Sequence, residues 1–203
     1  TLDGQFANAG LPQPGEPVTI GGGAVAIGNT PIHVTRLSDY QMPRIDPTRI
    51  AVAHARLRTI AGEYLQSSEI PAETINTLRL EPAAALDQLL GRGSGLTPFG
   101  DDIVCGMLAT LLASRDSCAA ELRDRVLALA PDRTTSLSAT LLRRAAAGDV
   151  LPVFADAAIA VTQHDEHASE RIRRLLSIGH TSGAGMLLGF SVALDHITLR
   201  SCS

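Results

Sequence analysis

Gly91-Arg-Gly-Ser-Gly-Leu-Thr-Pro-Phe-Gly-Asp-Asp-Ile-Val-Cys-Gly106 is the stretch of the chain that decides its architecture. Glycines at 91, 93, 95 and 100 predict a loop, because glycine adopts positive φ angles and lets the backbone approach a ligand. The apolar run 103–112 that follows predicts a helix buried on nearly every side. Backbone amides of such a loop, together with the helix N-terminus, form an anion site without lysine. The stretch therefore predicts both a central helix and a candidate binding loop.

Helical spacing of apolar residues continues through nearly all of the chain beyond this loop. We expect helices at 101–114, 117–130, 136–147, 150–163, 166–178 and 183–196, preceded by helices at 46–64 and 83–90. Residues 17–34 alternate short β-prone runs with turn residues, which predicts two or three strands. The expected fold class is α+β. A short β-strand segment in residues 1–45 precedes a predominantly helical domain in residues 46–203, and we expect the two to form one compact unit.

Composition excludes several classes of function. The 203 residues are 45% hydrophobic and 19% charged, which is typical of a folded protein. The net charge of -4 and the aromatic content of 3% argue against nucleic-acid binding. All 17 basic residues are arginine, so a Walker P-loop, a protein kinase site and a Schiff-base lysine are excluded. We expect a cytoplasmic protein without a membrane partner, because no leader-like N-terminus and no unbroken apolar run of about 18 residues occur.

A second loop, Gly179-His-Thr-Ser-Gly183, repeats the design of the first. In both loops a threonine follows a glycine by two residues, as Thr97 follows Gly95 and Thr181 follows Gly179. In both, a later glycine also precedes a mid-helix glycine by six residues, in the pairs 100/106 and 183/189. The repeat predicts that both loops bind one anionic ligand. The candidate binding residues are Gly93, Gly95, Thr97 and Gly100 in the first loop, and Thr181, Ser182 and Gly183 in the second. His180 is a candidate catalytic residue that donates to the anion or transfers a proton, although a structural role for this histidine is as strongly supported.

Two further groups of polar residues flank these loops. Thr135 and Ser138, in Arg133-Thr-Thr-Ser-Leu-Ser138, are candidate ligand-binding hydroxyls or, alternatively, helix caps. Asp101 and Asp102 are candidate catalytic carboxylates, and the alternative for both is compensation of the helix dipole. Neighbouring helical residues point about 100° apart, so one of the two aspartates should face the ligand. We expect this to be Asp102, which is also the candidate ligand for Mg²⁺, because Gly106 on the same helical row leaves room for a close neighbour or a ligand.

The cysteines give no sign of a metal site. Cys105, Cys118 and Cys202 are odd in number and contain no CxxC pair, so we expect neither a disulfide framework nor a cysteine zinc site. No cysteine lies close in sequence to an activating histidine.

Three motifs in order carry a resemblance to a known family. Over about residues 85–196, the chain resembles the signature of the AllH-like family. The resemblance lies in three motifs, in this order: Gly91-x-Gly-x-Gly-Leu-Thr-Pro-x-Gly-Asp-Asp, Arg133-Thr-Thr-x-x-Ser138 and Gly179-His-Thr-Ser-Gly183. The resemblance implies a part in carbamoyl transfer between oxamate and carbamoyl phosphate, within an assembly of several kinds of subunit. A non-catalytic metabolite-binding or scaffolding subunit is the main alternative, and a purely structural helical domain is a third.

Overall fold

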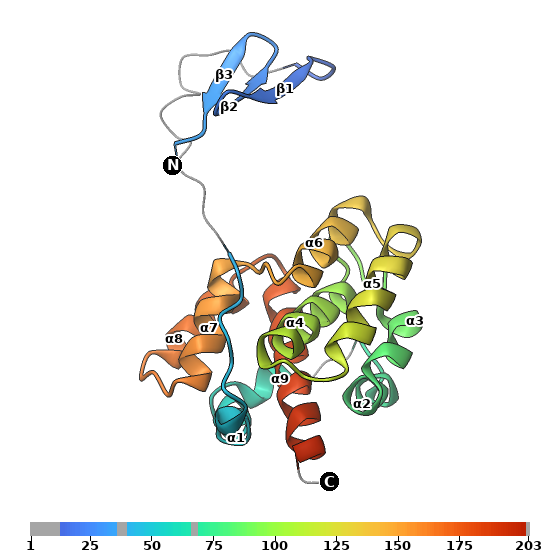
Figure 1. Cartoon of the computed structure of the whole chain (residues 1–203), viewed down its shortest axis with the longest axis vertical. Coiled ribbons are helices and arrows are strands. Elements are labelled where there is room, and N and C mark those ends of the chain that lie inside the picture. Colours follow the sequence, from blue (N-terminus) through green and yellow to red (C-terminus); the bar gives the residue numbers. More distant parts are fainter. Residues whose placement is uncertain (1–12, 36–39, 66–68, 202–203) are drawn as a thin grey trace. The chain divides into compact units, whose positions relative to one another are not determined.

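The computed structural model describes residues 13–35, 40–65 and 69–201, and the chain divides into two compact units, residues 1–39 and 40–203. The described part of the first unit is an antiparallel sheet of β1 (Val18–Gly21), β2 (Ala24–Ile27) and β3 (Thr30–His33), in that order (Figure 1). Its register pairs Val18 with Ile27 and Ala24 with His33. Glycines with positive φ at 22, 23 and 28 form the two tight turns between the strands. The expected N-terminal β segment is thus confirmed.

The described part of the second unit is helical, which confirms the α+β class. Its α-helices are α1 (Ile50–Ala61), α2 (Ala72–Leu80), α3 (Leu86–Leu89), α4 (Phe99–Ser114), α5 (Ala119–Arg133), α6 (Ser136–Ala146), α7 (Pro152–Thr162), α8 (Ala168–Leu176) and α9 (Ser182–Ser201). Short 3₁₀ turns lie at Pro47–Arg49, Gly62–Leu65 and Pro82–Ala85.

Two departures from the sequence-based expectation concern the first helices. The helix expected at 46–64 is divided, because Asp46 caps a separate 3₁₀ turn by accepting a 2.9 Å hydrogen bond from the amide of Thr48. Helix α2 was not expected at all. It buries only Thr74 and Leu78, which is too few apolar positions to produce a helical pattern in the sequence.

Helices α4 and α9 form the centre of the second unit and lie side by side in Figure 1. They run in the same direction, because Thr97 and Ser182 meet at one end and Cys118 and His196 meet at the other. Their backbones are in direct contact through Gly106, where an added Cβ would lie 2.2 Å from the carbonyl oxygen of residue 186. The missing side chain of Gly106 therefore leaves room for a close neighbour, α9, which is one of the two expected occupants, and not for a ligand.

Helix α9 is also the one described helix that is long and apolar enough to cross a membrane, judged by length and composition. In the structure 72% of its apolar window is buried. The core helix of a bundle has the same composition, since it is covered by other helices on most sides.

Candidate functional site

The N-termini of α4, α6 and α9 converge on one region, and hydroxyl groups join the segments that precede them. Thr97 Oγ1 in the first loop lies 2.9 Å from Ser182 Oγ in the second. Thr135 Oγ1, at the start of α6, donates a 2.5 Å hydrogen bond to the carbonyl oxygen of Leu96. The two glycine-rich loops therefore meet, as their repeated pattern predicts, and the third hydroxyl cluster joins them.

Asp101, in the first turn of α4, accepts hydrogen bonds from both the first loop and the start of α6. It is completely buried, and its Oδ1 accepts a 2.8 Å hydrogen bond from the amide of Gly91. Its Oδ2 accepts hydrogen bonds from Ser138 Oγ, at 2.6 Å, and from Thr134 Oγ1. Because these bonds hold the loop and the start of α6 in place, the geometry favours a positioning role for Asp101.

Asp102 differs from its neighbour in having a free oxygen. Only 3% of the residue is exposed, yet its Oδ2 has no hydrogen-bond partner among the described residues. Burial raises the pKa of this carboxyl to about 7, against the lowering effect of the Ser182 hydroxyl and with a further rise from the Asp101 charge. A carboxyl that titrates near neutral pH can accept or donate a proton, and an unpaired carboxylate oxygen is also a ligand for Mg²⁺.

The four candidate glycines fall into two kinds. Gly93 and Gly95 are exposed and have φ angles of +117° and +91°, so their backbone can be reached from solvent. Gly100 and Gly183 are buried, and a Cβ on them would lie 2.1 Å and 1.9 Å from a backbone carbonyl oxygen. The structure thus gives Gly100 and Gly183 a packing requirement. Gly93 has one as well, because a Cβ there would lie 2.7 Å from the amide nitrogen of Phe99, whereas Gly95 has no atom within 4 Å of an added Cβ.

The remaining candidates are placed around this region. The His180 side chain is exposed and makes no hydrogen bond or ion pair with any described residue, Asp102 included. The carbonyl oxygen of Thr181 accepts a 2.9 Å hydrogen bond from the amide of Gly185 in the first turn of α9. Thr135 is the N-cap of α6 and accepts a 3.1 Å bond from the amide of Ser138, in agreement with the capping alternative.

A family model described as oxamate carbamoyltransferase subunit AllH matches residues 89–194. The chain belongs to the AllH family. The match contains both glycine-rich loops and the hydroxyl cluster at 133–138, so the family region coincides with the converging helix N-termini. Comparison with curated proteins and with solved structures found no match.

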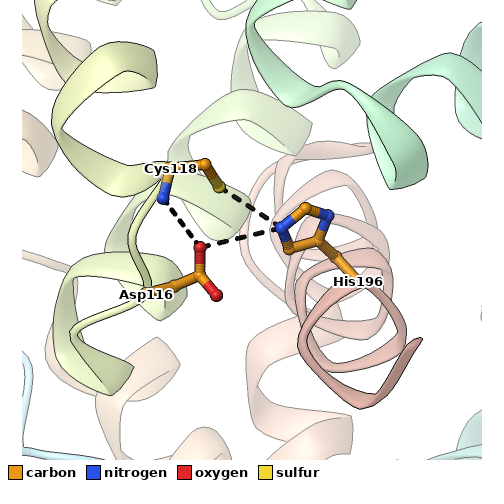
Figure 2. Close-up of side chains that lie close together, drawn as sticks. All are labelled: Asp116, Cys118 and His196. Carbon is orange, nitrogen blue, oxygen red and sulfur yellow. Dashed lines mark hydrogen bonds and ion pairs between the residues drawn. The ribbon is translucent and has the colours of Figure 1, made fainter. Parts of the chain in front are cut away.

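This AllH-family chain also brings together residues that sequence reasoning left apart. Figure 2 shows Cys118 beside His196 and Asp116, with Cys118 Sγ 3.3 Å from His196 Nε2. Cys118 and His196 are 78 residues apart in the chain, so no local motif indicated the pair, and only the fold brings this cysteine to a histidine. Burial and the neighbouring Asp116 raise the pKa of the Cys118 thiol to about 12, which disfavours a thiolate nucleophile. Cys202 lies outside the described residues.

The raised pKa of Asp102 predicts how the stability of this AllH-family protein depends on pH. Between about pH 4 and pH 7 the folded state keeps a proton that the unfolded state has lost, so ionisation of Asp102 lowers stability as the pH rises. Asp102→Asn removes this loss. We expect the unfolding free energy of the variant, relative to the parent, to rise by about 1 to 3 kcal/mol between pH 4 and pH 8.

Urea denaturation at each pH measures this difference. The matched control is Asp132→Asn, which alters an exposed carboxylate and should give a difference that is nearly constant with pH. A pH-independent difference for Asp102→Asn as well would contradict the account of a buried carboxyl held near neutrality.

Proposed function

We propose that this AllH-family chain binds a small phosphate- or carboxylate-bearing metabolite at the joined N-termini of α4, α6 and α9, and takes part in carbamoyl transfer. The observation that carries the proposal is the buried, unpartnered Oδ2 of Asp102. An unpaired polar atom in the interior costs about 1 to 3 kcal/mol, so it favours a ligand that supplies the missing partner. The family description supports carbamoyl transfer as the reaction.

Electrostatics at the site suit an anion despite the two aspartates. The N-termini of α4 and α9 each contribute about half a positive charge, and the exposed amides around Gly93 and Gly95 are free to donate. Since the pKa of Asp102 is about 7, this carboxyl is partly neutral at physiological pH and repels an anion less than an ordinary aspartate does. Alternatively, Mg²⁺ bound at Asp102 bridges the carboxylate and a substrate phosphate.

The chemistry assigns a proton-transfer role to Asp102. In carbamoyl transfer to oxamate, the amide nitrogen of oxamate attacks the carbamoyl carbon, the bond between this carbon and the phosphate oxygen breaks, and phosphate leaves with the electron pair. The attacking nitrogen gives up one proton, which the ionised form of Asp102 accepts. The loop amides and Thr97 neutralise the leaving phosphate. His180 is a second candidate for proton transfer because it lies in the adjoining loop.

The second candidate function is a non-catalytic subunit that binds the metabolite or serves as a scaffold in the cytoplasm. The observation that favours it is the family description, which names a subunit and so indicates an assembly with partner chains. Separate binding and catalysis measurements distinguish the two functions.

Calorimetric titration of the isolated chain with carbamoyl phosphate and with oxamate, each with and without Mg²⁺, tests the proposal. Saturable binding accompanied by phosphate release in the presence of both compounds would support the enzyme. Binding without turnover would support the metabolite-binding subunit. If neither compound binds under any of these conditions, the proposed binding site is wrong.

A further inference from the structure

A second cluster of polar side chains lies at the far end of α4, outside the candidate site. Asp116 and Cys118 belong to the turn between α4 and α5, and His196 comes from the second half of α9 (Figure 2). One ligand atom from each of the three side chains lies within 4.8 Å of the other two. Asp102 and Asp116 are separated by about 20 Å along α4, so the two regions are distinct.

The orientation of His196 leaves one ring nitrogen facing the cluster. Its Nδ1 lies 2.7 Å from the backbone carbonyl oxygen of Arg79, at the end of α2, and therefore carries the hydrogen of the neutral ring. In the neutral ring Nε2 is then the atom with the lone pair, and it lies 3.3 Å from Cys118 Sγ, in a hydrogen bond, and 3.7 Å from Asp116 Oδ1. A histidine that binds a metal through one nitrogen usually donates the other nitrogen's hydrogen to such a carbonyl or carboxylate.

Two of the three separations between the ligand atoms are close to those around a tetrahedral ion, and the third, between Cys118 and Asp116, is within 4.8 Å. With Zn–S near 2.3 Å and Zn–N or Zn–O near 2.0 to 2.1 Å, tetrahedral angles place ligand atoms about 3.3 to 3.6 Å apart. The observed 3.3 Å and 3.7 Å match this range within a few tenths of an ångström. Asp116 Oδ1 also accepts a 2.9 Å bond from the amide of Cys118, which fixes the carboxylate in place.

We propose that Asp116, Cys118 and His196 bind one Zn²⁺ ion. The ion takes His196 Nε2, Cys118 Sγ and a carboxylate oxygen of Asp116 as ligands, and water occupies the fourth position. Cys118 is half-buried and Asp116 is partly exposed, so an ion and its water can enter from solvent. On binding, the Cys118 thiol becomes a thiolate and its proton is released to solvent.

Bound zinc would link three parts of the helical unit. It joins the turn between α4 and α5 to α9. Because His196 also hydrogen-bonds the carbonyl oxygen of Arg79, the end of α2 is held to the same site. Because this end of α4 is remote from Asp102, the ion stabilises the fold rather than contacting the metabolite. The proposal is therefore independent of the proposed function.

The test uses the full chain with Cys105 and Cys202 both changed to Ser, so that Cys118 is the one remaining thiol. After removal of metal with a chelator, titration with Zn²⁺ in competition with a chromophoric chelator should give one site per chain. Co²⁺ should give the visible bands of a tetrahedral ion and a thiolate-to-cobalt charge-transfer band. Cys118→Ser in this background should abolish the charge-transfer band and weaken zinc binding more than about 100-fold.

A second measurement does not depend on any ligand variant folding. Zn²⁺ should protect the Cys118 thiol from alkylation in the same background, whereas Mg²⁺ should not. His167→Gln, an exposed histidine outside the cluster, is the matched control and should leave zinc affinity unchanged. Absence of protection, or equal zinc affinity with and without the Cys118 thiol, would overturn the proposal and leave a hydrogen-bonded cluster only.

Discussion

Asp101→Ala is expected to lower the free energy of unfolding by about 3 to 5 kcal/mol. The change removes the acceptor of three hydrogen bonds and leaves the donors from Gly91, Thr134 and Ser138 without their partner in a buried region. Because these donors belong to the first loop and to the start of α6, the loss should also free the two segments from each other. Urea denaturation measures the stability.

Asp87→Ala is the matched control for this variant. Asp87 also accepts hydrogen bonds from two residues, Arg125 and Arg133, but its side chain is 50% exposed. Exposed ion pairs contribute about 0 to 1 kcal/mol, so the control should lose no more than that. Equal losses for Asp101→Ala and Asp87→Ala would show that Asp101 does not hold the segments together.

Gly106→Ala should destabilise the protein by about 3 kcal/mol or more, because the added methyl group forces α4 and α9 apart. The new Cβ would lie 2.2 Å from the Met186 carbonyl oxygen, which is backbone and has no alternative rotamer. The matched control is Gly62→Ala, at a position with helical φ of -55° and no atom within 4 Å of the added Cβ. The control should be neutral or slightly stabilising. Thermal unfolding measures the stability of both variants. An equal change in the unfolding temperature of Gly106→Ala and Gly62→Ala would contradict the close contact of α4 and α9.

The sequence predicted the core helices and the N-terminal strands, but it did not predict the helices between residues 46 and 80 correctly. Helices α4 and α9 are predictable because long apolar runs follow glycine-rich loops. Helix α2 buries little, so its sequence lacks the apolar period from which helices are predicted. The division of the helix expected at 46–64 depends on the local cap at Asp46, which apolar periodicity does not detect.

The candidate site was predictable where a pattern repeats within the chain. The shared Gly and Thr spacing of the two loops indicated that Thr97 and the 179–183 segment belong together, and Thr97 does contact Ser182. The partners of Asp101 and the pairing of Cys118 with His196 were not predictable. They depend on tertiary packing that brings distant segments together, and a single sequence holds no local signal of such contacts.

The affinity of the isolated chain for carbamoyl phosphate, measured by calorimetry for the parent, Asp102→Asn and Asp132→Asn, tests the central claim most directly. Asp102→Asn keeps the size of a side chain that is nine-tenths or more buried and removes its ability to ionise, so the fold should be retained. If the free oxygen of Asp102 contacts the metabolite or its Mg²⁺, this variant should bind at least about tenfold more weakly than the parent, a loss of about 1.4 kcal/mol, while Asp132→Asn binds as the parent does. Equal affinity in all three folded proteins would contradict the claim and remove Asp102 from the binding site.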